Sequence, residues 1–363
     1  MNIIAQGNTT ETQNQIGVQQ LLATFRRYFH IPDEIGFSIV MACAIAHHIP
    51  GEMLWIRVYG GSRSGKTELF RAIAEQGDSA KMETITPASI RGGLGKGSRL
   101  LERIDGKLVI TKDLASMLTS KRELRNEVFG LMRNVKDGEL VSDFGTEDGH
   151  LHQHSKFDWL IATTPVFAQY RTMEDLLGSR FIDLKWQATD REEMTLRALE
   201  NNSSLPTIRQ EMAEATGRLM DHYKTMPAPE LDDDTKNLIV CLADLTAKLR
   251  SPIARDNHHR VKFQPEAEVG TSLAQNLDRI ARALRLMGIT EITPHLIRLC
   301  LDSIPHSRIE ILSELVNDEV STANRNWYDF DDLRLLGICD KTERGYRLKS
   351  DLKWLIEIFI KWR

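Results

Sequence analysis

The amino-acid sequence predicts an α/β fold whose sheet carries a phosphate-binding loop. Three observations lead to this prediction. The run 60–67, Gly-Gly-Ser-Arg-Ser-Gly-Lys-Thr, fits the pattern G-x-x-x-x-G-K-S/T in full. The apolar run 54–59 before it is typical of a buried strand, and the run 68–74 after it has the spacing of an amphipathic helix. Further short apolar runs, which we expect to be the other strands, follow between helical stretches.

The strand–loop–helix setting distinguishes a phosphate loop from a chance match to the motif. Glycines let backbone N–H groups turn toward one point, and a helix N-terminus adds partial positive charge there. Lys66 would reach the β- and γ-phosphates of ATP, and the Thr67 hydroxyl would take one position on Mg²⁺. A glycine-rich turn without a ligand is the alternative that the flanking runs disfavour. The expected nucleotide-binding residues are Gly60, Gly61, Ser62, Arg63, Ser64, Gly65, Lys66, Thr67 and Glu68.

Composition limits the classes of protein to which the chain can belong. It has 363 residues, 41% of them hydrophobic, and a net charge of −4, so nucleic acid would bind through local patches. The most apolar run, 37–45, is too short to span a bilayer, and the N-terminus lacks a signal-peptide pattern. We expect a cytoplasmic protein with no membrane segment. The four cysteines, which fit buried thiols better than disulfides or a zinc site, are Cys43, Cys241, Cys300 and Cys339.

Changes of pattern along the chain indicate five parts. Pro32 divides the helical stretch that leads into the core. Helical spacing continues over 190–223, 232–249, 265–287 and 294–302, with a basic loop at 251–264. The expected parts are a flexible tail at 1–15, N-terminal helices at 16–50, a nucleotide-binding core at 51–188, a helical lid at 189–304 and a C-terminal module at 305–363.

Two of the predicted core strands end in polar residues that suit nucleotide chemistry. The predicted strands after the loop are 80–86, 107–111, 159–162 and 181–184. Asp113 follows the second of these and would serve Mg²⁺ or the attacking water; capping a helix that begins at Leu114 is its alternative. Two adjacent acids are usual at such a strand end, but here Lys112 precedes the acid. Thr163 and Thr164 follow the strand 159–162 and would read the γ-phosphate or hold water, unless they are ordinary strand-end threonines.

Two further segments have open interpretations. The glycine-rich run 92–98 is either a mobile loop that carries Leu94 and Lys96 toward a pore or a surface connection. Residues 139–156 predict a β-hairpin that turns at 145–149. Its histidines alternate, and they would share one strand face that binds metal or phosphate, or a face in solvent. We expect the solvated face, because no carboxylate or cysteine at ligand spacing completes a site. The histidines are His150, His152 and His154.

The last part of the chain has the helix–helix–hairpin pattern of a winged helix. The helices are expected at 308–316 and 330–336, and the hairpin at 338–348. Three acids, Asp329, Asp331 and Asp332, fall in the second helix. They disfavour the reading of DNA bases there and favour contact with a protein partner, or with phosphate through the basic hairpin.

The chain resembles an AAA+ ATPase over 54–184. The resemblance makes 60–67 its phosphate loop and 159–164 its sensor-1 strand, and it puts Lys112 where the first acid of the family stands. The run 177–181, Leu-Gly-Ser-Arg-Phe, is similar to the box whose arginine reaches the neighbouring subunit's nucleotide. That implies an arginine finger at Arg180, acting in trans. The catalytic residues implied together are Lys66, Asp113, Thr163, Thr164 and Arg180.

More narrowly, the chain resembles the minichromosome-maintenance-like ATPases of bacterial mobile elements. The resemblance rests on the hairpin before sensor 1, the helical lid, the winged helix and the run 301–305 followed by Arg308. It implies a hairpin, here 144–156, that projects into a ring channel and touches single-stranded DNA, although its tip carries Glu147 and Asp148. The sensor-2 candidates are Arg191 and Arg197.

The leading functional expectation is an oligomeric ATPase, a hexamer or similar ring, that remodels DNA or moves along it as a helicase-like motor or loader. The first alternative is a nucleotide-switched scaffold or signalling ATPase, for example in phage defence, that recruits a protein partner. A single acid at the Mg²⁺ strand favours slow hydrolysis, which suits such a switch. The second alternative is a transposition-type regulator that coats duplex DNA.

Overall fold

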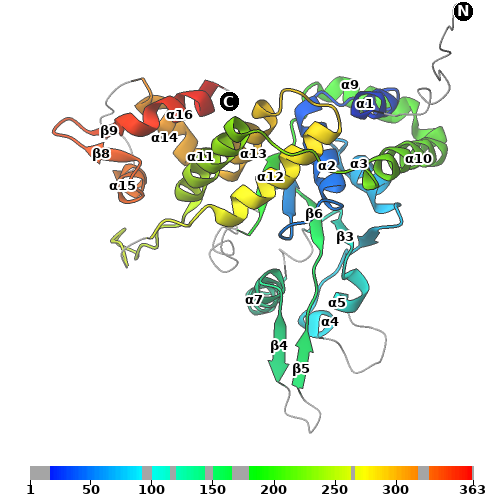
Figure 1. Ribbon diagram of the computed structural model, residues 1–363, viewed down its shortest axis with the longest axis horizontal. Helices are drawn as coiled ribbons and strands as arrows, with labels where there is room; N and C mark the ends of the chain where they lie inside the picture. The colour runs from blue at the N-terminus through cyan, green and yellow to red at the C-terminus, as the bar shows by residue number, and fades with distance from the viewer. Residues whose placement is uncertain are drawn as a thin grey trace, which may run out of the picture.

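Five parallel strands form the centre of the molecule (Figure 1). The computed structural model describes residues 17–91, 100–114, 120–143, 150–165, 180–262, 266–317 and 327–361. The strand order across the sheet is β2-β3-β6-β1-β7, and all four neighbouring pairs are parallel. The predicted α/β fold is therefore confirmed. The strands are β1 (Trp55–Tyr59), β2 (Ser79–Lys81), β3 (Leu108–Thr111), β6 (Asp158–Thr163) and β7 (Ile182–Lys185).

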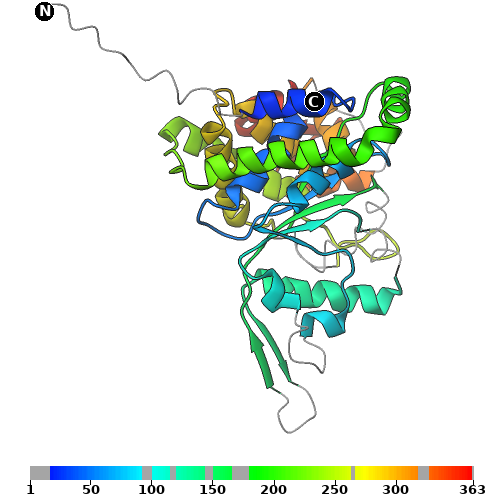
Figure 2. The same ribbon diagram turned by 90° about the vertical axis from the view of Figure 1, so that its right-hand side faces the viewer.

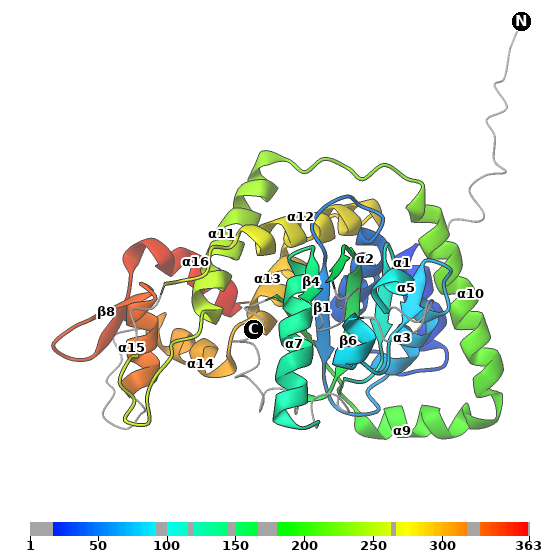
Figure 3. The same cartoon turned by 90° about the horizontal axis from the view of Figure 1, so that it is seen from below.

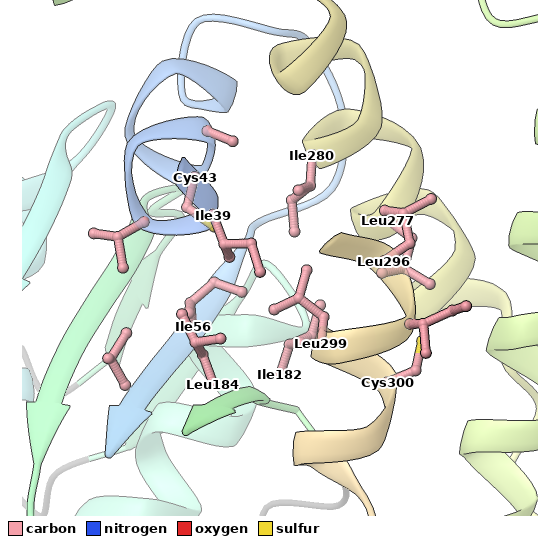
Figure 4. Packing of buried hydrophobic residues seen from close by; sticks show 14 of the residues in the cluster. Ile39, Cys43, Ile56, Ile182, Leu184, Leu277, Ile280, Leu296, Leu299 and Cys300 are labelled. Atoms are coloured by element: carbon pink, nitrogen blue, oxygen red, sulfur yellow. The ribbon is translucent and has the colours of Figure 1, made fainter. Parts of the chain in front are cut away.

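Side chains alternate between the two faces of this sheet, and each face has its own apolar layer. Ile56 and Val58 point into a large core, which they share with α1 (Val18–Arg26), α2 (Glu34–Ala46), α3 (Lys66–Ala74), α10 (Leu205–Lys224), α11 (Asp233–Arg250), α12 (Thr271–Leu286) and α13 (Thr293–Ser303). Figure 4 shows how Ile39, Ile56 and Leu299 meet between α2, β1 and α13. Helix α2 is buried on all sides, so the apolar run at 37–45 is a core helix.

A smaller aromatic core covers the other face. The rings of Trp55 of β1 and Trp159 of β6 pack edge to face with their centroids 5.2 Å apart. The ring of Phe157 stacks on Trp55 with a centroid distance of 5.6 Å. The helices on this side are α4 (Pro87–Arg91), α5 (Leu100–Ile104) and α7 (Arg122–Lys136). The two cores explain why the strands are apolar at consecutive positions.

A two-stranded hairpin projects from the aromatic side of the sheet (Figures 1 and 2). Its strands are β4 (Leu140–Asp143) and β5 (His150–Gln153), and they pair antiparallel with Leu140 opposite Gln153. Leu140 and Gln153 are buried against the body. The predicted hairpin is present, whereas its turn at 145–149, with Glu147 and Asp148, lies outside the described residues.

The C-terminal part packs three helices around a second small hairpin (Figure 3). These elements are α14 (His306–Leu315), α15 (Trp327–Leu335), β8 (Cys339–Lys341), β9 (Tyr346–Leu348) and α16 (Ser350–Lys361). Phe330, Leu355 and Phe359 belong to the same apolar core as the helices above the sheet. The two helices and the hairpin that the sequence predicts here are present.

Some predicted elements differ from the observed ones. The strand predicted at 80–86 ends at Lys81, and Pro87 starts α4 because proline suits the first turn of a helix. The helical stretch at 190–223 divides into α9 (Arg191–Glu200), a single 3₁₀ turn and α10. Helix α12 begins at Thr271 and not at Pro265, since residues 266–269 form no regular element.

Other predictions concern segments outside the described residues. These are the tail at 1–15, the glycine-rich run 92–98, and residues 177–179 of the arginine-bearing box. Within the described ranges, no helix combines the length and apolar character needed to cross a membrane. The four cysteines are free thiols, and all except Cys241 are buried.

Candidate functional site at the carboxyl edge of the sheet

The glycine-rich loop lies between the carboxyl end of β1 and the N-terminus of α3. Gly65 takes a left-handed backbone with φ of 84° directly before α3, a conformation in which side chains are strained. The Gly60 N–H donates to the carbonyl oxygen of Thr163 at 3.3 Å. The start of the loop is thereby tied to the end of β6, the strand beside β1.

Lys66 points back into the loop and is 6% exposed. Its Nζ donates to the carbonyl oxygens of Gly60 at 2.9 Å and Gly61 at 2.7 Å, and to Ser64 Oγ at 2.9 Å. Burial lowers the pKa of Lys66 to about 8, although the Asp113 carboxylate acts in the opposite direction. The ammonium is therefore held by uncharged oxygens, which anionic phosphate oxygens would outcompete.

Trp186 fixes the loop from the β7 side, and sequence reasoning missed it. Its indole Nε1 donates to the Ser64 carbonyl oxygen at 2.9 Å, and the side chain is 2% exposed. A Cβ added to Gly60 would lie 2.7 Å from the Trp186 carbonyl oxygen, so glycine is needed there for close approach. The signal in the sequence was an aromatic residue shortly after the predicted strand 181–184, next to the strand that carries the loop.

The parallel strands bring the other predicted site residues to the same edge of the sheet. Strand β6 lies between β1 and β3, so Thr163 and Thr164 come between the loop and Asp113. Asp113 is exposed and Thr163 is buried. This edge therefore presents a carboxylate and threonine groups beside the N-terminus of a helix.

Lys112, which stands before Asp113, takes part in a different interaction. Its Nζ lies 2.9 Å from Oε1 of Glu83, just beyond β2, and this contact lowers the pKa of Glu83. One acid, Asp113, thus follows β3 in the described segment that ends at Leu114. The helix that Asp113 was alternatively expected to cap would begin at Leu114, the last described residue of this segment, so the rest of that helix would lie outside the described ranges.

The first helical turn after the loop contacts α10. Thr67 is exposed, whereas Glu68 accepts two hydrogen bonds from Arg209 of α10, at 2.8 and 2.7 Å. The predicted nucleotide-binding residue Glu68 is therefore engaged by an arginine that sequence reasoning did not single out. The sensor-2 candidate Arg197 is directed elsewhere, to Glu193 at 2.5 Å and to the Arg26 carbonyl. Arg191, the other candidate, is exposed at the start of α9.

Arg180 lies at the amino ends of the parallel strands, opposite the carboxyl ends that carry the loop. It comes two residues before β7, whose register with β1 starts at Ile182 opposite Ile56. Its Nη2 pairs with Asp137, just after α7, at 2.9 Å. Because β7 itself spans about 10 Å, Arg180 is not brought to the loop 60–67 of its own chain.

His152 and His154 of the hairpin are exposed, as expected of a face in solvent, but the expectation that no carboxylate joins them is wrong. A carboxylate does reach them: Glu139, His152 and His154 each offer a ligand atom, and these atoms lie within 4.8 Å of one another. Glu139 was overlooked because its partners are distant in sequence and come close only across the hairpin. The His150 side chain lies outside the described part of the structure.

The chain folds as an α/β protein built on a five-stranded parallel sheet. No protein-family model matches the chain, and no curated protein matches it significantly. We therefore base the functional assignment on the residues at the carboxyl edge of the sheet and on their contacts.

Proposed function

We propose that the chain is an AAA+-type ATPase that hydrolyses ATP as an oligomer and uses the energy to remodel DNA or move along it. The observation that supports this most is Lys66, buried inside the loop with its ammonium on two carbonyls and one hydroxyl at the N-terminus of α3. A buried ammonium at the N-terminus of a helix favours an anion there. ATP carries that anion as its β- and γ-phosphates.

The residues around the loop suit the remaining tasks of ATP hydrolysis. The loop N–H groups and Lys66 would hold the phosphates, and Thr163 and Thr164 would orient the attacking water. The exposed Thr67 and Asp113 offer hydroxyl and carboxylate oxygens, the donors that Mg²⁺ prefers. Mg²⁺ would neutralise charge that develops on the phosphates. Trp186 would keep the loop backbone in place through its bond to the Ser64 carbonyl.

Arg180 would complete the site of a neighbouring chain. Its position at the far edge of the sheet favours action in trans, because it cannot approach its own loop without unfolding β7. In an oligomer the guanidinium would exchange Asp137 for the γ-phosphate held by the adjacent chain. There it would stabilise the charge on the transferring phosphoryl group.

Mixing two inactive variants tests both the site and its shared nature. Lys66→Ala removes the phosphate contact, and Arg180→Ala removes the finger, so each variant alone should lose ATP turnover by at least about a hundredfold. An equimolar mixture should recover roughly a quarter of wild-type activity, because that share of interfaces combines an intact Lys66 with an intact Arg180. The measurement is phosphate release at fixed total protein.

Each outcome of the mixing experiment is informative. Unchanged turnover in both single variants would overturn the site assignment. Two inactive variants whose mixture stays inactive would mean that Arg180 does not act in trans. Each variant alone, at the full protein concentration of the mixture, is the matched control for residual activity.

A nucleotide-switched scaffold is the second candidate, and two observations favour it. A single acid follows β3 in the described segment, because Lys112 stands in the adjacent position and pairs with Glu83. Asp331 and Asp332, two of the three acids that disfavour the reading of DNA bases by α15, pair with Arg255 within the chain. Both features suit slow hydrolysis and contact with a protein.

The response to DNA separates the candidates. A motor should show turnover that rises severalfold with single-stranded DNA, and its DNA affinity should fall steeply with salt. A scaffold should assemble with ATP and ignore DNA. A transposition-type regulator should form filaments on duplex DNA, which electron microscopy would show.

A further inference from the structure

The base of the projecting hairpin places three metal-ligating side chains on one face. Leu140 pairs with Gln153, so the preceding Glu139 comes opposite His154, while His152 lies diagonally across. The rings of His152 and His154 are 4.6 Å apart, and His152 Nε2 contacts Glu139 Oε1. All three residues are exposed, whereas Leu140 and Gln153 on the opposite face are buried. The body of the protein therefore supports this face from behind.

The hydrogen bonding of His154 leaves one ring nitrogen for a ligand. Its Nδ1 lies 3.2 Å from the Gly138 carbonyl oxygen, which can only accept, so Nδ1 carries the proton. Nε2 is then the atom with a free lone pair. A backbone carbonyl that orients a histidine in this way is the usual partner of a metal-bound imidazole.

We propose that Glu139, His152 and His154 bind a zinc ion that holds the base of the hairpin together. Two imidazoles and one carboxylate form a donor set used for Zn²⁺, with a fourth position open to water. Tetrahedral zinc with bonds of about 2.0–2.1 Å has ligand atoms about 3.3 Å apart. The three ligand atoms already lie within 4.8 Å of one another, so small side-chain rotations bring them to this separation. Nitrogen donors disfavour Mg²⁺ and Ca²⁺, which prefer oxygen.

Calorimetric titration of the full chain with zinc chloride tests the proposal. The protein is made without a histidine tag, freed of metal with a chelator and kept free of nucleotide. We expect one Zn²⁺ per chain in the wild type. His152→Ala, His154→Ala and Glu139→Gln should each weaken binding by at least about tenfold, because each removes a ligand. Mg²⁺ should not bind at this site, and Co²⁺ should give the visible absorption bands of tetrahedral coordination.

His306→Ala is the matched control. His306 also pairs with a glutamate, Glu310 at 3.4 Å, but belongs to no group of three potential ligands among the described residues. Its zinc affinity should equal that of the wild type. Zinc should also slow amide hydrogen exchange in β4 and β5, and in the three ligand variants it should not.

Two results would overturn the zinc site. One is the absence of one-to-one binding by the wild-type chain. The other is equal zinc affinity in the wild type and the ligand variants, which would mean that the ion is held elsewhere. Both results are independent of ATP turnover, so they leave the ATPase proposal untouched.

Discussion

The side chain of Lys66 is a buried ammonium whose hydrogen-bond partners carry no negative charge. Burial lowers its pKa to about 8, yet its three hydrogen-bond partners are uncharged. The unfolded chain holds this proton up to a pH near 10.5. Stability of the free protein should therefore rise as the pH increases from about 8 to about 10.5, since the unfolded state binds more protons in this window.

The affinity for ATP should show the opposite pH dependence. Phosphates beside Lys66 would raise its pKa again, so binding to neutral Lys66 must take up a proton. The dissociation constant should then increase by up to about tenfold per pH unit above pH 8. Fluorescence titration with a labelled nucleotide from pH 7 to 9.5 measures this. Lys66→Met, which binds more weakly, should have a flat profile over the same range; an equally flat wild-type profile would refute the mechanism.

Sequence patterns predicted those site residues whose neighbours are adjacent in the chain. The place of the loop 60–67 between a strand and a helix was predictable because its motif and flanks are continuous, and the place of Asp113 at a strand end because it follows an apolar run. Trp186 and Arg209 were not, since their contacts with Ser64 and Glu68 join residues more than a hundred positions apart. Glu139 was missed for a related reason, because the hairpin register decides which acid comes opposite His154.

At the scale of elements, one buried ionic network joins α12 to the sheet. Both terminal guanidinium nitrogens of Arg279 donate to Asp158 at the start of β6, Nη1 at 3.1 Å and Nη2 at 2.9 Å, and Nη2 also donates to the Ala46 carbonyl oxygen at 2.6 Å. Burial acts to raise the pKa of Asp158, but hydrogen bonds from His47 and Arg279 outweigh it and lower the pKa. The network therefore stabilises the fold above the acid range and weakens as the pH falls below about 4.

Removing the arginine from this network should be costly. Arg279→Met leaves Asp158 buried with His47 as its remaining side-chain partner, so we expect a loss of about 3–5 kcal/mol in the free energy of unfolding. The matched control is Arg282→Met on the same helix, which loses pairs with Asp278 and the exposed Glu230 and should cost less than about 1 kcal/mol. Urea unfolding followed by circular dichroism measures both. Equal losses would refute the role of the network.

Elements were predictable where one local pattern determines them. Strands β1, β3 and β6 and helix α11 lie within two residues of their predicted bounds. The strand predicted to extend to Thr86 is shorter, because β2 pairs with β3 only over Ser79–Lys81 at the sheet edge. The order of the strands in the sheet could not be predicted from the sequence, since it depends on which strands pair across long connections.

At the scale of the whole molecule, Arg255 fastens the C-terminal part to the helical region. It donates to Asp332 at 2.6 Å and Asp331 at 3.2 Å, and the neighbouring His259 stacks on Tyr328 at 4.5 Å. Asp331 and Asp332, two of the three acids of α15 that disfavoured base reading in the sequence, thus have a partner inside the chain. The side chains of Arg255 and both acids are largely buried.

Loss of this contact should loosen the C-terminal part. Arg255→Met leaves two largely buried carboxylates with less compensation, so chymotrypsin should cleave within 306–361 several times faster than in the wild type. Arg334→Met is the control, because Arg334 pairs with the same Asp331 at 2.7 Å but is more exposed. Mass spectrometry of the fragments gives the cleavage rates. Equal rates in the two variants would contradict the fastening role of Arg255.

The parallel direction of all five strands has a consequence for counting sites in an assembly. The loop 60–67 lies at the carboxyl ends of the strands, and Arg180 lies at their amino ends. If Arg180 serves the adjacent chain as we propose, every contact is head to tail, and each chain gives one arginine and receives one. A closed ring then has as many complete sites as chains, whereas an open row always has one fewer. Turnover per chain would thus report whether the assembly is closed.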